Sequence, residues 1–234
     1  MLGWGGRGEG AYVRGWGRGT AATLAGCLLL AGCGGSGGGG TGESRGARGE
    51  AARVLREAVR ATDAAGSART ESVSEIEGEL TRSRGALDWS GKPYGRLRVG
   101  VGGDLVLKDG EAWVRLARPV GGKRWVRQRT GTDLVPAASL RLLLAAADAH
   151  RAGRARVRGV VTTHWAGRVR AAESARVREA GVAAQSVDVW LDARGRLVKR
   201  VESGRGKAGL VRVTTYWSGF GTDVEVPRVP GGGN

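Results

Sequence analysis

The spacing of apolar residues predicts two helices in this chain. Over residues 50–62 they recur every three or four positions, which indicates an amphipathic helix that ends at Gly66. A second helix is predicted over residues 136–152, with a proline at its first position and Gly153 just past its end. Its leucines are concentrated in residues 140–144 and face more than one side of the helix. We therefore expect this helix to pack on more than one face, within a concave sheet.

Elsewhere apolar residues recur at every second position, which is typical of strands. Glycine-rich joints separate these segments, and Asp109-Gly110 is a strong hairpin signal. A short charged insertion over residues 169–180 could be helical. The order helix, six strands, helix, five strands predicts an antiparallel meander. The predicted strands are residues 68–77, 79–89, 96–101, 104–107, 111–116, 123–128, 156–165, 186–192, 196–203, 210–218 and 223–227.

Alternation sorts the strand side chains into two faces, one of which is aliphatic. Such a face must be covered, and the leucine-rich helix is the obvious cover. Because one helix is narrow against eleven strands, the sheet must curl, leaving either a dry core or an apolar space for a ligand. The candidate lining residues are Leu97, Val99, Leu107, Val114, Leu116, Leu140, Leu143, Leu144, Val161, Trp165, Val189, Leu191, Val213 and Trp217. The same predicted face holds Val101, Leu105, Val157, Val187 and Val211.

The opposite face alternates Trp113, Trp125 and Trp190 with arginine and lysine. Arginine stacked on tryptophan is a common way to order a solvated surface. Platforms that bind outside polymers use the same residue types. Both interpretations stay open at this point.

An uncharged segment rich in alanine and leucine, residues 20–32, follows a basic N-terminus. It is shorter than the roughly 20 residues of a membrane-spanning helix and suits a secretory signal. Leu30-Ala31-Gly32-Cys33 resembles the lipobox of bacterial lipoproteins, which implies a diacylglyceryl group on Cys33 and cleavage before it. Cys27 ends the same tetrapeptide but has a shorter apolar run before it. A disulfide between the two would close a very small loop inside an apolar segment.

The predicted cleavage divides the chain into four parts. A signal peptide spans residues 1–32, and residues 33–49 hold the lipidated Cys33 and a flexible glycine-rich tether. Residues 50–230 form one folded domain, and residues 231–234 form a flexible tail.

The formal net charge is +16, and the chain stays strongly basic after cleavage. Nucleic acid is the first partner that such a charge suggests, but an exported, lipid-anchored protein rarely meets any. We therefore expect the negatively charged partner to be a bilayer surface or an anionic cell-wall polymer.

Three segments of the last third carry a family resemblance: GVVTTHWAG at 159–167, VDVWLD with GRLV at 187–198, and TTYWSGFG with VEVP at 214–227. They resemble actinobacterial lipoproteins of the LppX and LprG group, in the LolA-like superfamily. The resemblance implies an α+β fold, a strongly curved antiparallel half-barrel with helices packed in its concave face. It also implies an apolar cavity for acyl chains and a role in carrying or presenting lipids outside the cytoplasmic membrane.

Residues suited to catalysis are scarce. His164 falls on the polar face with no cysteine near it, and a satisfied or exposed strand histidine is the expected role. The sequence has no HExxH motif, phosphate loop or catalytic serine setting. We therefore predict a protein that is not an enzyme and uses no cofactor or metal.

These observations predict a monomeric lipoprotein anchored on the extracytoplasmic face of the cell membrane. It would bind an acyl-chain lipid or glycolipid between sheet and helix. The alternative is a non-enzymatic surface or regulatory lipoprotein that binds an anionic cell-wall polymer or a partner protein.

Overall fold

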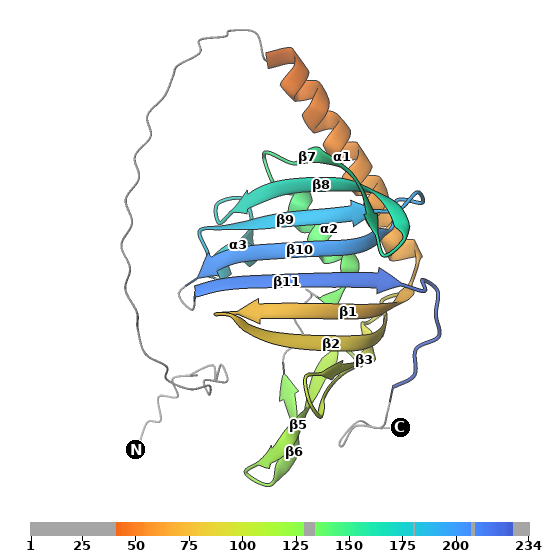
Figure 1. Ribbon diagram of the computed structural model, residues 1–234, viewed down its shortest axis with the longest axis vertical. Helices are drawn as coiled ribbons and strands as arrows, with labels where there is room; N and C mark the ends of the chain where they lie inside the picture. The colour runs from red at the N-terminus through yellow and green to blue at the C-terminus, as the bar shows by residue number, and fades with distance from the viewer. Residues whose placement is uncertain (1–40, 129–133, 180, 207–208, 227–234) are drawn as a thin grey trace, which may run out of the picture. The chain divides into compact units, whose positions relative to one another are not determined.

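The computed structural model describes residues 41–128, 134–179, 181–206 and 209–226 (Figure 1). Contacts among residues 40–234 form one self-contained unit. The helices are α1 (Thr41–Ala64), α2 (Pro136–Leu144) and α3 (Ala175–Glu179). The strands are β1 (Ser67–Ile76), β2 (Glu79–Asp88), β3 (Tyr94–Val99), β4 (Gly103–Lys108), β5 (Glu111–Val120), β6 (Lys123–Gln128), β7 (His150–Val157), β8 (Val160–Arg170), β9 (Ala184–Leu191), β10 (Leu197–Gly206) and β11 (Gly209–Ser218).

All eleven strands belong to one antiparallel sheet, in the order β6-β5-β4-β3-β2-β1-β11-β10-β9-β8-β7. Each strand pairs with its neighbour in sequence except where β1 pairs with β11 and α2 joins the two edge strands, β6 and β7. Figure 1 shows α2 behind the sheet, where it contacts β8, β9 and β10. The sheet is curved and open, with the helices on its concave face, so the predicted fold class is confirmed.

Two-residue turns with positive φ at both positions join four of the hairpins, as type I′ turns require. They are Glu77-Gly78, Asp109-Gly110, Gly121-Gly122 and Arg158-Gly159. The Arg158-Gly159 turn divides the predicted strand 156–165 into the end of β7 and the start of β8. Consequently Val157 pairs with Val160 on the convex face, opposite to the face predicted for it.

The backbones of β2 and β3 approach each other closely at two glycines. A Cβ on Gly85 would lie 1.8 Å from the carbonyl oxygen of Arg96, and one on Gly95 would lie 2.4 Å from that of Ala86. Only glycine permits backbones to approach so closely, so these two residues allow the observed pairing of β2 with β3.

The core lies between the helices and the concave face. Leu55 of α1, Leu140 and Leu143 of α2, and Val187 and Val189 of β9 are fully buried there. The backbone carbonyl of Thr62 accepts a hydrogen bond from Trp89 Nε1, while its hydroxyl accepts one from the backbone N–H of Leu197. These contacts fix the end of α1 against two separate parts of the sheet.

Both helices differ in length from the prediction. Residues 41–49, assigned to the flexible tether, belong to α1. A helix already held by packing gains one hydrogen bond for each residue it adds, which explains the extension. Residues 1–40, including Cys33 and the predicted signal peptide, lie outside the described residues.

The helix predicted over 136–152 ends at Leu144, because the chain must turn there to enter β7 at the sheet edge. The Asp148 carboxylate accepts a hydrogen bond from the backbone N–H of Arg168 and holds this turn against β8. Gly153, predicted to follow the helix, lies at an irregularity in the pairing of β7 with β8.

Two further predictions are wrong. Val101 lies in the β3–β4 turn and is 98% exposed instead of facing the core. Residues 223–226, predicted to begin a last strand, form none, because the neighbouring strand β11 is already paired on both sides by β1 and β10. The charged insertion does contain a short helix, α3.

Candidate ligand site

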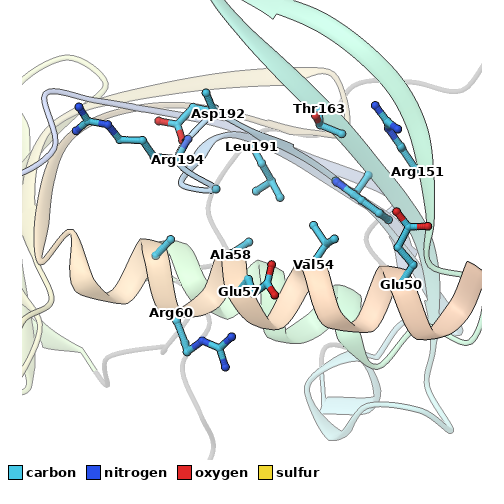
Figure 2. A pocket seen from close by; sticks show the side chains of 14 residues that line it. Glu50, Val54, Glu57, Ala58, Arg60, Arg151, Thr163, Leu191, Asp192 and Arg194 are labelled. Atoms are coloured by element: carbon cyan, nitrogen blue, oxygen red, sulfur yellow. The ribbon is translucent and has the colours of Figure 1, made fainter.

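A cleft of about 620 Å³ lies between α1 and the concave face of the sheet (Figure 2). Strands β7, β8 and β9 and the turn after β9 form its other wall. The lining residues are Glu50, Val54, Glu57, Ala58, Arg60, Ala61, Arg151, Thr163, Trp165, Leu191, Asp192, Ala193, Arg194 and Gly195.

An apolar strip runs along the cleft. Val54, Ala58 and Ala61 recur at helical spacing on one side of α1, and Trp165 and Leu191 lie on the sheet. Figure 2 shows Val54 and Leu191 pointing toward each other from opposite walls. Val54 and Ala61 are only half-buried, so part of the strip is accessible from solvent.

Two of the three acids in the cleft already have cationic partners. Both carboxylate oxygens of Glu57 accept hydrogen bonds from Arg53, at 2.9 and 3.1 Å. Asp192 accepts from the backbone N–H groups of Arg194 and Arg196 and pairs with the Arg196 guanidinium at 2.8 Å. Asp192 therefore holds the β9–β10 turn in shape.

The other charged groups of the lining form no ion pair with another described residue: Glu50, Arg60, Arg151 and Arg194. In Figure 2, Arg60 points away from the sheet, whereas Arg151 and Arg194 lie toward opposite ends of the cleft. Positive groups thus outnumber negative ones among the unpaired charges.

Trp165 is 4% exposed, and its indole N–H has no hydrogen-bond partner among the residues that the structure describes. A buried donor without an acceptor costs about 1–3 kcal/mol. Trp165 pairs across the strands with Arg151 and lies two residues from Thr163 on the same face. Three hydrogen-bond donors therefore lie on this wall.

A buried polar cluster lies beside α2 on the same concave face. Glu202 accepts hydrogen bonds from Ser139, Arg176 and Gln185 at 2.5, 2.9 and 2.7 Å. Arg200 donates to Ser139 at 2.6 Å and lies 3.4 Å from Glu202. Burial raises the pKa of Glu202, but the two guanidinium groups and the hydrogen bonds outweigh it and hold that pKa below its usual range.

The sequence reasoning missed Arg200 and Glu202, which occupy inward positions of β10. The alternation of side chains along residues 196–203 could have placed them, because it puts Arg200 and Glu202 on the inward face. The structure pairs them there with Val189 and Val187 of β9.

Side chains on the convex face form a stacked row. The His164 ring lies parallel to Trp190 with 4.2 Å between centroids, and His164 Nε2 is 2.8 Å from Asp188. Lys199 Nζ lies 4.0 Å from the Trp190 ring centroid. Burial lowers the pKa of Lys199 despite the opposing effect of Asp188. Since β8 and β10 flank β9, both faces of this tryptophan are occupied, which favours packing over polymer stacking at Trp190.

Two of the predicted ligand-lining residues, Trp165 and Leu191, border the cleft. The others lie on the concave face of the sheet or, for Leu140, Leu143 and Leu144, on α2, and as ligand contacts they stay predictions. Val161 is 58% exposed, and Val114, Leu116 and Val213 are half-buried. Val99 and Leu144 pack partly buried against the core. The closed core contains Leu97, Leu107, Leu140, Leu143, Val189 and Trp217.

Within the described parts of the chain, no group of His, Cys, Asp and Glu could hold a metal ion. A bilayer-crossing helix, long and apolar enough for the purpose, is likewise not found among those residues.

No known family model matches this chain. A Streptomyces coelicolor protein whose name describes it as a lipoprotein, SCO4650, is 32% identical over 216 residues, covering 76% of this chain and 72% of that protein. An uncharacterised 31.2 kDa protein of Streptomyces griseus is 30% identical over 228 residues, covering 74% and 75%.

Two solved structures share the fold. LppX of Mycobacterium tuberculosis has a TM-score of 0.58 at 15% identity, covering 76% of this chain and 99% of LppX. LprF of Mycobacterium bovis has a TM-score of 0.50 at 15% identity, covering 77% and 97%. The chain therefore belongs to the same Streptomyces lipoprotein family as SCO4650, and its domain has the LolA-like fold of LppX and LprF.

Proposed function

We propose that this lipoprotein is anchored through Cys33 on the extracytoplasmic face of the cell membrane and binds an acyl-chain lipid or glycolipid without catalysing a reaction. The acyl chain lies in the cleft between α1 and strands β7–β9. The observation that supports this is the apolar strip of Val54, Ala61 and Leu191, which borders an open cleft of about 620 Å³.

Burial of hydrocarbon supplies the driving force for such binding. Each methylene transferred from water into the cleft contributes about 0.8 kcal/mol. The volume lies within the roughly 300–1,000 Å³ of sites that hold one small ligand. The protein therefore acts as a carrier or presenter, and its specificity comes from the groups around the cleft mouth.

Native mass spectrometry tests this proposal on the full chain with Cys33→Ser, which keeps the predicted export signal and prevents acylation. Protein expressed in its own host is expected to carry lipid, and delipidated protein is expected to take up a monoacylglycerol. Ala61→Trp fills the half-buried end of the strip and should reduce uptake at least tenfold.

Ala52→Trp is the matched control, because Ala52 is half-buried on the same helix but does not line the cleft. It should leave uptake unchanged. A folded chain that neither carries nor takes up any acyl compound would refute the proposal.

A second candidate function rests on the convex face. Arg82 and Arg84 of β2 and Arg98 of β3 are exposed there and form no ion pair with a described residue. Their charge suits an anionic cell-wall polymer or an acidic partner protein. Pull-down on purified anionic polymer should then succeed at low salt and fail at high salt, and failure at both salts would exclude the polymer.

A further inference from the structure

We infer that the cleft selects an amphiphile with one acyl chain and an oxyanion headgroup, either a carboxylate or a phosphate, and that Arg151 binds the headgroup. The inference rests on the proposed function of the cleft and adds the chemical class of its ligand.

The unpaired charges of the cleft support an anionic ligand. Glu57 and Asp192 are neutralised by Arg53 and Arg196, so they do not repel a negative headgroup strongly. Arg151 and Arg194 remain without an ion pair among the described residues, and Glu50 is the acid that opposes them. An oxyanion at Arg151 would complete a charge-assisted hydrogen bond that the protein itself leaves unmade.

Hydrogen-bond donors place the headgroup at the β7–β8 end. Arg151 and Trp165 are cross-strand partners, and Thr163 faces the same side two residues away. The Trp165 indole N–H has no acceptor among the described residues, but its nitrogen is fully buried, so the donors open to a headgroup are Arg151 and Thr163. Carboxylate and phosphate oxygens accept hydrogen bonds from both.

The size of the cleft limits the hydrocarbon to one chain. The apolar positions of α1 run from Val54 to Ala61, about 10 Å along a helix. From a headgroup at Arg151, a single chain would run along this strip toward the β9–β10 turn. A second chain would have to enter space that Leu140, Leu143 and Val189 fill completely.

Isothermal titration calorimetry on the chain from residue 33 onward, with Cys33→Ser, tests the inference. The probes are oleate, lysophosphatidylglycerol and monooleoylglycerol, each below its critical micelle concentration. Both anionic probes should bind at least tenfold more tightly than the neutral one, and the tighter of the two identifies a carboxylate or a phosphate as the preferred headgroup.

Charge variants at the two ends of the cleft locate the headgroup. Arg151→Gln should weaken the anionic probes about tenfold and leave monooleoylglycerol unchanged. Glu50→Gln, which removes the opposing charge, should tighten them. Arg194→Gln, which removes the same charge from the far end of the cleft, should weaken them less. Arg154→Gln is the matched control, because Arg154 is an exposed arginine of the same strand that does not line the cleft, and its loss should have little effect.

The outcomes separate this inference from the proposed function. Equal binding of all three probes would overturn the oxyanion selectivity while supporting an acyl site. Equal losses in Arg151→Gln and Arg194→Gln would overturn the assignment to Arg151. Binding of none of the probes would overturn both proposals.

Discussion

Glu202 is a buried carboxylate on a face of the sheet that packs mainly apolar side chains. Two arginines, a serine and a glutamine surround it, so its charge is compensated at every side. Removing one partner of a buried ion pair leaves the other charge buried and unpaired, which lowers the folding stability by about 3–5 kcal/mol. This cluster is therefore required for the native packing of α2 and α3, both of which contribute to it.

Glu202→Gln should lower the free energy of unfolding at pH 7 by about 3 kcal/mol. The folded protein holds the pKa of Glu202 below its usual value of about 4.5, so this stabilisation is present above pH 4.5. It is lost as the pH falls below that value, because the unfolded chain then binds the proton first. Urea denaturation between pH 7 and pH 3 should show a smaller loss of stability in the variant.

Glu71→Gln provides the control, since Glu71 pairs with Arg158 on the exposed convex face. Such a surface pair contributes about 0–1 kcal/mol. Parallel pH profiles for the wild type and Glu202→Gln would contradict the assigned role of Glu202.

Among the elements, regular hairpins were predictable and the irregular joints were not. Asp109-Gly110 predicts its turn correctly because both residues tolerate positive φ, which both adopt in the structure. Arg158 adopts φ of +47° without being a usual turn residue, so the prediction placed the last two residues of β7 in one strand with β8. The end of α2 at Leu144 depends on the distance to the sheet edge, which no local pattern contains.

Gly167 determines how closely α2 approaches β8. A Cβ there would lie 2.8 Å from Leu143 Cδ1 and 3.1 Å from the Cβ of Ala146, closer than normal contacts allow. Gly167→Ala should therefore push α2 away and destabilise the fold by about 1–3 kcal/mol in urea denaturation.

Gly204→Ala is the matched control, because it is also a strand glycine of the concave face. Its added Cβ would meet the carbonyl oxygen of Ala184 at 3.4 Å, an ordinary contact. If Gly204→Ala loses as much stability as Gly167→Ala, then the loss comes from replacing any strand glycine and not from the close approach of α2 to β8.

At the scale of the whole molecule, the alternation of apolar and polar residues along the strands predicted the aliphatic face and the curved sheet. It did not predict most of the residues that line the cleft. Trp165 and Leu191 could be assigned because they alternate within strands. Glu50, Arg151 and Arg194 line one cleft only because α1 crosses β7–β9 near the β9–β10 turn. Their sequence separation and common residue types give no local signal.

The proposed membrane attachment has two separable physical sources. Cys33 is predicted to carry an acyl anchor. The chain left after the predicted cleavage keeps a net charge of +14, because residues 1–32 hold three arginines and one glutamate, and this charge would attract it to anionic lipid headgroups. High salt screens the second interaction and leaves the first unchanged. Membranes from the native host should therefore retain the wild-type protein after a high-salt wash.

Cys33→Ser should release the protein from those washed membranes, measured by immunoblotting of the soluble and membrane fractions. Cys27→Ser is the matched control: it changes the other Leu-Ala-Gly-Cys tetrapeptide, which the predicted cleavage removes, so retention should persist. Retention of Cys33→Ser after the wash would mean that another group holds the protein, and release of Cys27→Ser alone would move the anchor to Cys27.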